Sequence, residues 1–156
     1  MRPLGQRLVD WATSQLGVAE DPPLSNAGPP MERYALPGED PLPWCGRFVR
    51  AAFTACDAPL PGNPYELAAV AHIHHVFEEQ GWLLATSSAP QPGDLVLMKR
   101  RDPRNRRGMH CCFVEAAAGT KLWTIGGNEG DAVRRVLRHL FDTDIVAFGR
   151  RPDPQP

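Results

Sequence analysis

Three residues that lie far apart in the sequence could together cleave an amide bond: Cys45, His110 and Asn128. A cysteine thiolate is a nucleophile, a histidine can accept the thiol proton and later protonate the leaving amine, and an amide oxygen can orient the imidazole. Each residue also has a simpler interpretation, because a lone histidine in a strand is usually structural and asparagine is common in turns. The hypothesis therefore depends on whether the surrounding elements bring the three side chains together.

Cys45 is predicted to begin a helix over residues 45–57. Small or apolar residues recur after it at helical spacing and define a core-facing side: Phe48, Val49, Ala52, Phe53 and Cys56. The opposite side carries Arg47, Arg50, Thr54 and Asp57. The start of a helix has partial positive charge and free backbone N–H groups, which favour a thiolate over a thiol. The alternative is that Cys45 is a small buried residue that only packs.

The chain divides into a helical first half and a strand-rich second half. Helices are expected over residues 3–16, 45–57 and 65–80, and the segment 18–44, with seven prolines, is expected to be an ordered loop. Strands are expected over residues 94–98, 109–116, 121–125, 133–137 and 145–149. This order predicts an α+β fold, with one catalytic domain over residues 1–152 and a frayed tail over 153–156.

The second predicted strand carries two rows of side chains. His110, Cys112 and Val114 point to one face, and Met109, Cys111 and Phe113 point to the other. A helix packed on the sheet brings Cys45 against one of these rows, and contact with the His110 row would create a nucleophile and base. The next strand ends at Gly126-Gly127-Asn128, so pairing of neighbouring strands can set Asn128 beside His110.

Composition excludes several classes of function. The net charge is −1, so no global field attracts nucleic acid, and no apolar run of about 18 residues could insert into a membrane. Residues 1–7 lack the apolar stretch of a secretory signal. The four cysteines, with Cys111 and Cys112 adjacent, do not resemble a disulfide framework. We expect a protein made in the cytoplasm without a Sec signal and with free thiols.

Several short segments resemble the CHAP and NlpC/P60 group of papain-like cysteine peptidases and amidases. In order, they are PWCGRFV at 43–49, PGDLV at 92–96, Met109-His110 at the start of a strand, and GGN at 126–128. Residues 12–26 and 146–152 also resemble the first helix and last strand of a subgroup whose nucleophile follows Pro-Trp. The resemblance covers nearly the whole chain. It implies a papain-like fold, with N-terminal helices packed on an antiparallel sheet, and a Cys45–His110–Asn128 triad without a cofactor.

The sequence also departs from the patterns of that group. Trp44 stands where NlpC/P60 members usually have aspartate, and Met109 stands where glycine commonly precedes the histidine. Many CHAP members carry glutamate two positions before the asparagine, where this chain has Gly126. We therefore expect Asn128 alone to orient His110.

Other residues are candidates for substrate contact or metal binding. Trp44 and Tyr34 are candidate cleft walls, although a core role for Trp44 is an equal alternative, and Glu129 is a candidate substrate contact. The basic segment 99–107 could hold an anionic polymer, but its simplest interpretation is a solvated loop. The helix over 65–80 carries His72, His74 and His75 without further ligands, so no metal site is expected.

The resemblance implies cleavage of an amide bond in bacterial peptidoglycan, in the stem peptide or cross-link. Endopeptidase activity is preferred over N-acetylmuramoyl-L-alanine amidase activity. Two alternatives remain open: a transamidase or deamidase acting on protein, and an inactive wall-binding module. The enzyme would act in the periplasm or cell wall after non-classical export, injection or phage lysis. An injected antibacterial effector (a toxin) would have a secretion machine and an immunity protein as partners, and a phage lysin would not.

Overall fold

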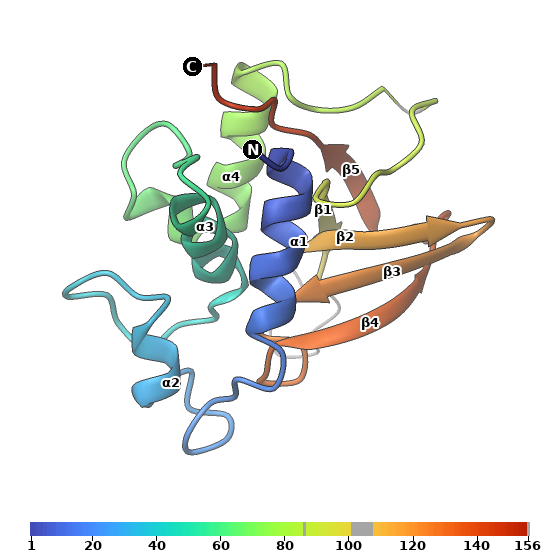
Figure 1. Ribbon diagram of the computed structural model, residues 1–156. Coiled ribbons are helices and arrows are strands. Elements are labelled where there is room, and N and C mark those ends of the chain that lie inside the picture. Colours follow the sequence, from blue (N-terminus) through green and yellow to red (C-terminus); the bar gives the residue numbers. More distant parts are fainter. Residues whose placement is uncertain (86, 101–107, 156) are drawn as a thin grey trace.

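The computed structural model of the chain describes residues 1–85, 87–100 and 108–155. The helices come first: α1 (Leu4–Ser14), α2 (Pro29–Glu32), α3 (Cys45–Ala55), the 3-10 helix η1 (Glu66–Ala68) and α4 (Val70–Glu79). The strands follow: β1 (Leu95–Lys99), β2 (Met109–Ala118), β3 (Lys121–Gly126), β4 (Arg134–His139) and β5 (Ile145–Gly149). They form one antiparallel sheet in the order β4-β3-β2-β1-β5 (Figure 1). The predicted α+β class is confirmed.

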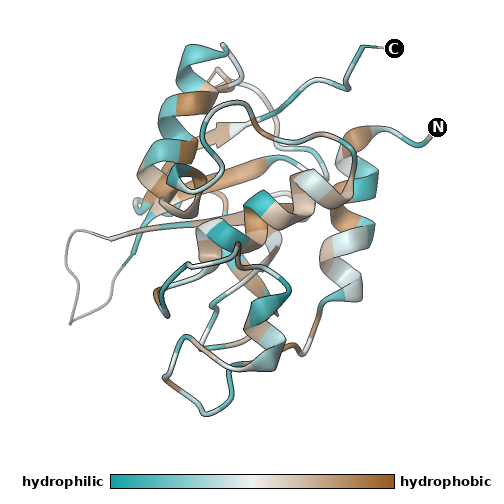
Figure 2. Ribbon diagram, turned by 90° about the vertical axis from the view of Figure 1, so that its left-hand side faces the viewer, coloured by the Kyte–Doolittle hydropathy of each residue, from teal (hydrophilic) through white to brown (hydrophobic). Residues whose placement is uncertain are grey.

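The main core lies between the helices and one face of the sheet. Helices α1 and α3 pack against β2 and β3, and α4 packs against β2 (Figure 1). Leu95 and Leu97 of β1 and Cys111 and Phe113 of β2 belong to this core. The other face carries a smaller apolar cluster, so side chains on both faces of the central strands are apolar. Strand segments in the interior of the molecule are accordingly coloured as hydrophobic in Figure 2. No helix within the described ranges has the length and apolar character needed to cross a membrane.

The helix predicted over residues 65–80 is interrupted in the structure. Ala69 has an extended backbone, with φ −89° and ψ 125°, and separates η1 from α4. The end of η1 lies against the first turn of α3, where a Cβ at position 46 would be 2.3 Å from the Ala68 carbonyl oxygen. Only glycine fits at position 46, and this close approach fixes the end of α3 that carries Cys45.

Of the predicted polar side of α3, Arg47 and Arg50 are buried, whereas Thr54 and Asp57 are exposed. The Arg50 guanidinium donates to the Glu39 carboxylate, to the Pro64 carbonyl at 2.9 Å and to the Tyr34 carbonyl at 2.8 Å. Arg47 donates to the Asp40 carbonyl at 2.7 Å, and its Nε lies 3.4 Å from Glu39. These contacts bury the Glu39 side chain to 5% exposure. Electrostatic contacts therefore hold the segment before Cys45 against α3.

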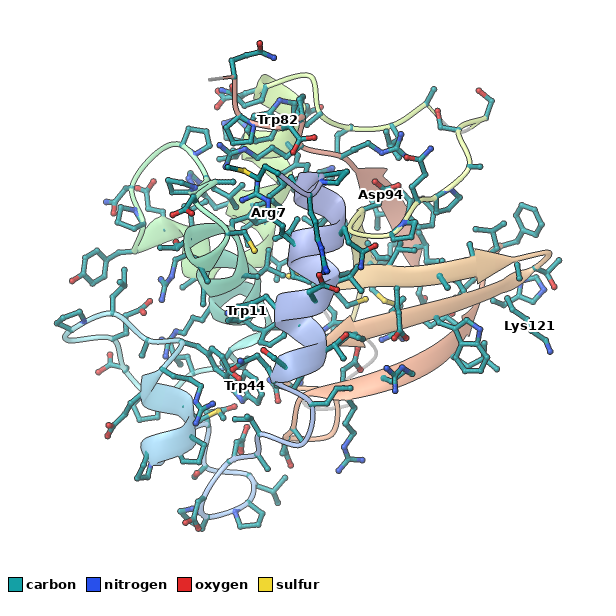
Figure 3. The ribbon with its side chains drawn as sticks, in the orientation of Figure 1. Arg7, Trp11, Trp44, Trp82, Asp94 and Lys121 are labelled. Carbon is teal, nitrogen blue, oxygen red and sulfur yellow. The ribbon has the colours of Figure 1, made fainter. Side chains whose placement is uncertain are left out.

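The two ends of the chain are tied to the same region. Asp153, the first residue of the predicted frayed tail, accepts a hydrogen bond from the Leu4 backbone N–H at 2.6 Å. The buried Asp94 carboxylate, just before β1, accepts two hydrogen bonds from Arg150, at 2.7 and 2.8 Å. Figure 3 shows the position of Asp94. The C-terminal segment thus joins the start of α1 to the sheet.

We predict that Glu39→Gln lowers the free energy of unfolding by about 3 kcal/mol, because it leaves two buried guanidinium groups without a counter-charge. Glu115→Gln is the matched control, because Glu115 pairs with the more exposed Arg135. Its expected cost is below about 1 kcal/mol. Urea unfolding measures both values, and an equal cost for the two variants would contradict the prediction.

We also expect the Glu39 carboxylate to contribute to the acid sensitivity of the fold. Burial acts to raise the pKa of Glu39, but the hydrogen bonds from Arg50 and Leu36, together with the charges of Arg50 and Arg47, lower it overall. The stabilisation is therefore complete above the ordinary carboxylate pKa and is lost as the pH falls through the lowered value. Unfolding measured against pH should show a smaller acid loss in Glu39→Gln than in the unchanged protein.

Candidate active site

Cys45 is the first residue of α3, and Trp44 before it anchors the start of the helix. The Trp44 indole donates to the Glu20 carboxylate at 2.8 Å and stacks on Tyr34, with ring centroids 5.6 Å apart. The Tyr34 hydroxyl donates to Gln15 at 2.9 Å. Trp44 and Tyr34 are only 1% and 2% exposed, and Figure 3 shows Trp44 at the lower end of α1. Trp44 therefore belongs to the core and positions Cys45. Tyr34 is also largely buried, but it is one of the residues that line a cavity of about 730 Å³, and Cys45 is not part of that lining.

The turn after β3 lies directly on the first turn of α3. A Cβ at position 127 would be 2.6 Å from the Phe48 Cβ and 2.7 Å from the Trp44 ring. No side chain fits in this space, so Gly127 permits the approach. The result is that the next residues, Asn128 and Glu129, are held beside the helix start that carries Cys45.

The helix packs on the row of β2 that does not contain His110. The Cys111 thiol donates to the Cys45 carbonyl at 3.5 Å, and the Cys45 sulfur is 4.0 Å from the Met109 carbonyl oxygen. His110 and Cys112 point toward the other face by strand alternation. His110 is nevertheless the second residue of β2, so its ring lies at the end of the sheet and interacts with Cys45.

Glu129, not Asn128, is the residue that contacts the His110 ring. The His110 Nε2 lies 2.6 Å from the Glu129 Oε1, and the Arg138 guanidinium donates to the same oxygen. The Arg138 Nε also donates to the Thr124 hydroxyl at 3.1 Å. A carboxylate fixed from β4 is thus in position to orient the imidazole, which is the task that the sequence assigned to the neighbouring amide.

Asn128 faces a different partner. Its backbone is left-handed, with φ +57°, and its amide oxygen accepts from the Arg100 guanidinium at 3.2 and 3.3 Å when the amide is oriented to satisfy both groups. The signal that could have identified Glu129 is Gly126. A Cβ at position 126 would lie 3.3 Å from the Glu129 Oε1 and 2.8 Å from the Cys112 Cβ. The absent side chain leaves the space that the Glu129 carboxylate occupies.

The electrostatics of the site favour a thiolate beside an imidazolium. A hydrogen bond with Cys111, and then hydrogen bonding and charge interaction with His110, hold the pKa of Cys45 well below its usual value despite burial. Burial acts to lower the pKa of His110, but hydrogen bonds with Cys112, Cys45 and Glu129 raise it well above its usual value. Burial acts to raise the pKa of Glu129, whereas His110 and Arg138 together lower it. The carboxylate is therefore ionised and stabilises the imidazolium.

A polar cavity of about 290 Å³ lies on the Glu129 side of His110. Its lining includes Asn128, Glu129 and Arg138, with Lys99 and Arg100 from the start of the basic segment. Cys45 is not part of this lining and is only 2% exposed. The rest of the basic segment, residues 101–107, lies outside the described residues.

A scan against protein-family models, a search of curated proteins and a search of solved structures each found no match. The resemblance to the CHAP and NlpC/P60 group therefore stays a prediction from the motifs. The chemical interpretation depends on the residues of the site themselves.

We predict that a small alkylating reagent labels Cys45 first among the four cysteines at mildly acidic pH. All four are buried free thiols. Burial raises the pKa of Cys56, and burial followed by contact with Cys45 raises that of Cys111. Only the thiolate reacts, so the fast phase should persist below the usual thiol pKa. Peptide mass mapping identifies the labelled residue.

His110→Ala should move the inflection of the Cys45 labelling rate to higher pH, because the stabilising imidazolium is gone. Cys45→Ser is the control, and it should abolish the fast phase. Faster labelling of Cys111 or Cys112 in the folded protein would contradict the assignment of Cys45 as the activated thiol.

Proposed function

We propose that this protein is a cysteine-dependent amide hydrolase in which Cys45 is the nucleophile and His110 the general base and acid. The observation that carries the proposal is that the His110 ring contacts the Glu129 carboxylate at 2.6 Å, while hydrogen bonding and charge interaction with the same His110 help to lower the pKa of the Cys45 thiol. Nucleophile, base and orienting group in this order are the general requirements of cysteine catalysis.

The chemistry follows from the groups present. The Cys45 thiolate attacks the amide carbonyl, and the oxyanion forms near the free backbone N–H groups of the first turn of α3. The imidazolium of His110 gives its proton to the departing amine, which leaves an acyl-thioester on Cys45. A water molecule, deprotonated by His110, then hydrolyses the thioester, which releases the acid and restores the Cys45 thiolate beside the His110 imidazolium. No step needs a metal ion.

The proposed substrate is an amide bond in the stem peptide or cross-link of bacterial peptidoglycan, and the proposed fold family is papain-like. Both rest on the motif resemblance and on the order helix, strand, strand for Cys45, His110 and the Gly-Gly turn. Endopeptidase activity is preferred over amidase activity on the same resemblance. A buried Cys45 requires that the substrate, or a movement that accompanies binding, opens the approach to the sulfur.

We predict that Cys45→Ala and His110→Ala each abolish hydrolysis of purified sacculi while the circular dichroism spectrum and melting temperature stay close to those of the unchanged protein. The first variant removes the nucleophile and the second removes the proton carrier. Iodoacetamide should inhibit the unchanged enzyme, and EDTA should not. Cys56→Ala is the matched control and should retain activity, because Cys56 lies at the other end of α3.

Mass spectrometry of the digested muropeptides distinguishes the possible bonds. Split stems or cross-bridges indicate an endopeptidase, and free stem peptides released from intact glycan indicate an amidase. If folded enzyme leaves every muropeptide unchanged but modifies a protein in a Cys45-dependent manner, the peptidoglycan substrate is wrong and the transamidase or deamidase alternative replaces it.

A second prediction separates Glu129 from Asn128. Glu129→Gln should lower kcat on the order of 10²-fold with little change in KM, because the imidazolium loses its counter-charge. Asn128→Ala should cost less than about 10-fold, because its amide faces Arg100. The acid limb of the pH–rate profile should move in Glu129→Gln and stay in place in Asn128→Ala. The reverse order of effects would return the orienting role to Asn128.

A further inference from the structure

Three metal-ligating side chains converge on the side of His110 that faces Glu129. One ligand atom each from His110, Cys112 and Glu129 lies within 4.8 Å of the other two. His110 and Cys112 are two positions apart on β2 and so share a face of the sheet, and Glu129 reaches them from the turn after β3. The proposed hydrolysis needs His110 and Glu129, but it gives no role to the Cys112 thiol.

These three ligand types suit a thiophilic divalent cation. An imidazole nitrogen, a thiolate and a carboxylate are the groups that bind Zn²⁺, and three protein ligands leave the fourth tetrahedral position for water. Bond lengths of about 2.0–2.3 Å place the ligand atoms roughly 3.5 Å apart. The side chains would have to move by about 1 Å, with the His110 to Glu129 contact widening and the others closing.

The surroundings allow such an ion to enter and to be enclosed. Cys112 is fully buried, and His110 is 6% exposed. The cavity of about 290 Å³ is lined by His110 and Glu129 and provides the approach. Arg138 opposes binding because it donates to Glu129, but both hydrogen bonds of the carboxylate use Oε1. Among the described residues no donor reaches Oε2, so this oxygen can turn toward a cation.

We propose that His110, Cys112 and Glu129 form a site for a thiophilic divalent cation such as Zn²⁺, and that the bound ion silences Cys45. The ion bonds to the Nε2 of His110, the Cys112 sulfur and a Glu129 oxygen. The Cys112 thiol and the His110 Nε2 each release a proton to solvent. A neutral histidine whose Nε2 holds the ion keeps its remaining proton on Nδ1, so it has no free nitrogen to accept a proton from Cys45 or from the water that hydrolyses the thioester. The silencing rests on the proposed function, whereas the binding does not.

The test of binding uses the full chain carrying Cys45→Ala, which removes the nucleophile as a possible ligand. The protein is stripped of metal and titrated with Zn²⁺ in competition with a chromogenic chelator. One ion per chain is expected. Titration with Co²⁺ should give the near-ultraviolet charge-transfer band of a thiolate-bound ion. No binding to this variant, or binding without the thiolate band, would overturn the proposal.

Matched variants in the same Cys45→Ala background assign the ligands. Cys112→Ser should weaken Zn²⁺ binding by more than about 100-fold and remove the thiolate band. Cys56→Ser, also a buried cysteine, should change neither. If Cys112→Ser proves unfolded by circular dichroism, Glu129→Gln provides the second test, with at least about a 10-fold loss of affinity. Full affinity in either folded variant overturns the assignment.

The silencing is tested on the unchanged protein. Zn²⁺ should inhibit hydrolysis over the concentration range in which it binds, and EDTA should restore activity. Binding without inhibition of an active enzyme would overturn the silencing. A metal-free protein that hydrolyses no amide would instead refute the proposed function and leave the binding result unaffected.

Discussion

The site depends on one steric constraint, the close approach of the β3–β4 turn to the first turn of α3. Position 127 has no room for a Cβ between Phe48 and Trp44, and position 46 has none against the Ala68 carbonyl. Gly127 therefore lets the β3–β4 turn contact α3, and Gly46 lets α3 contact the end of η1. These two close contacts hold the start of α3, where Cys45 lies. Because the approach is this close, Glu129 reaches a histidine on the neighbouring strand, and the thiol lies within interaction distance of the same imidazole.

Packing of this kind places several charged groups in a region with little water. A buried imidazolium is costly unless an anion accompanies it, and here the Cys45 thiolate and the Glu129 carboxylate are its neighbours. Arg138 completes the arrangement by donating to the carboxylate and to Thr124. Breaking one member leaves the others buried and unpaired, so the positions of Cys45, His110 and Glu129 are coupled in energy as well as in geometry.

His110 stands between two sets of partners, and this position links the two proposals. In the first set it exchanges protons with Cys45, with Glu129 holding the ring. In the second set Cys112 and Glu129 share a cation with the same ring. A nitrogen holds either a proton or a metal ion, so the two arrangements exclude each other. The identity of the group bound at the Nε2 would decide whether Cys45 reacts.

Much of the framework follows from the sequence because it depends on local patterns. Apolar spacing predicted the helix that begins at Cys45, and strand alternation predicted that His110 and Cys112 share a face. The α+β class follows from the order of these patterns. Such periodicities are set by backbone geometry, which each segment carries in its own residues.

Only the tertiary structure decided which side chains meet. Arg47 and Arg50 have the pattern of a solvated helix side, yet the segment containing Glu39 covers them. Trp44 and Tyr34 are in the core because Glu20 and Gln15, both distant in the sequence, accept their hydrogen bonds. Asn128 and Glu129 are adjacent in a turn. The backbone at Asn128 is left-handed, and the Glu129 side chain is the one that contacts the His110 imidazole. Adjacent residues of a turn point their side chains in different directions, which depend on the backbone angles of the turn. Sequence spacing does not determine those angles.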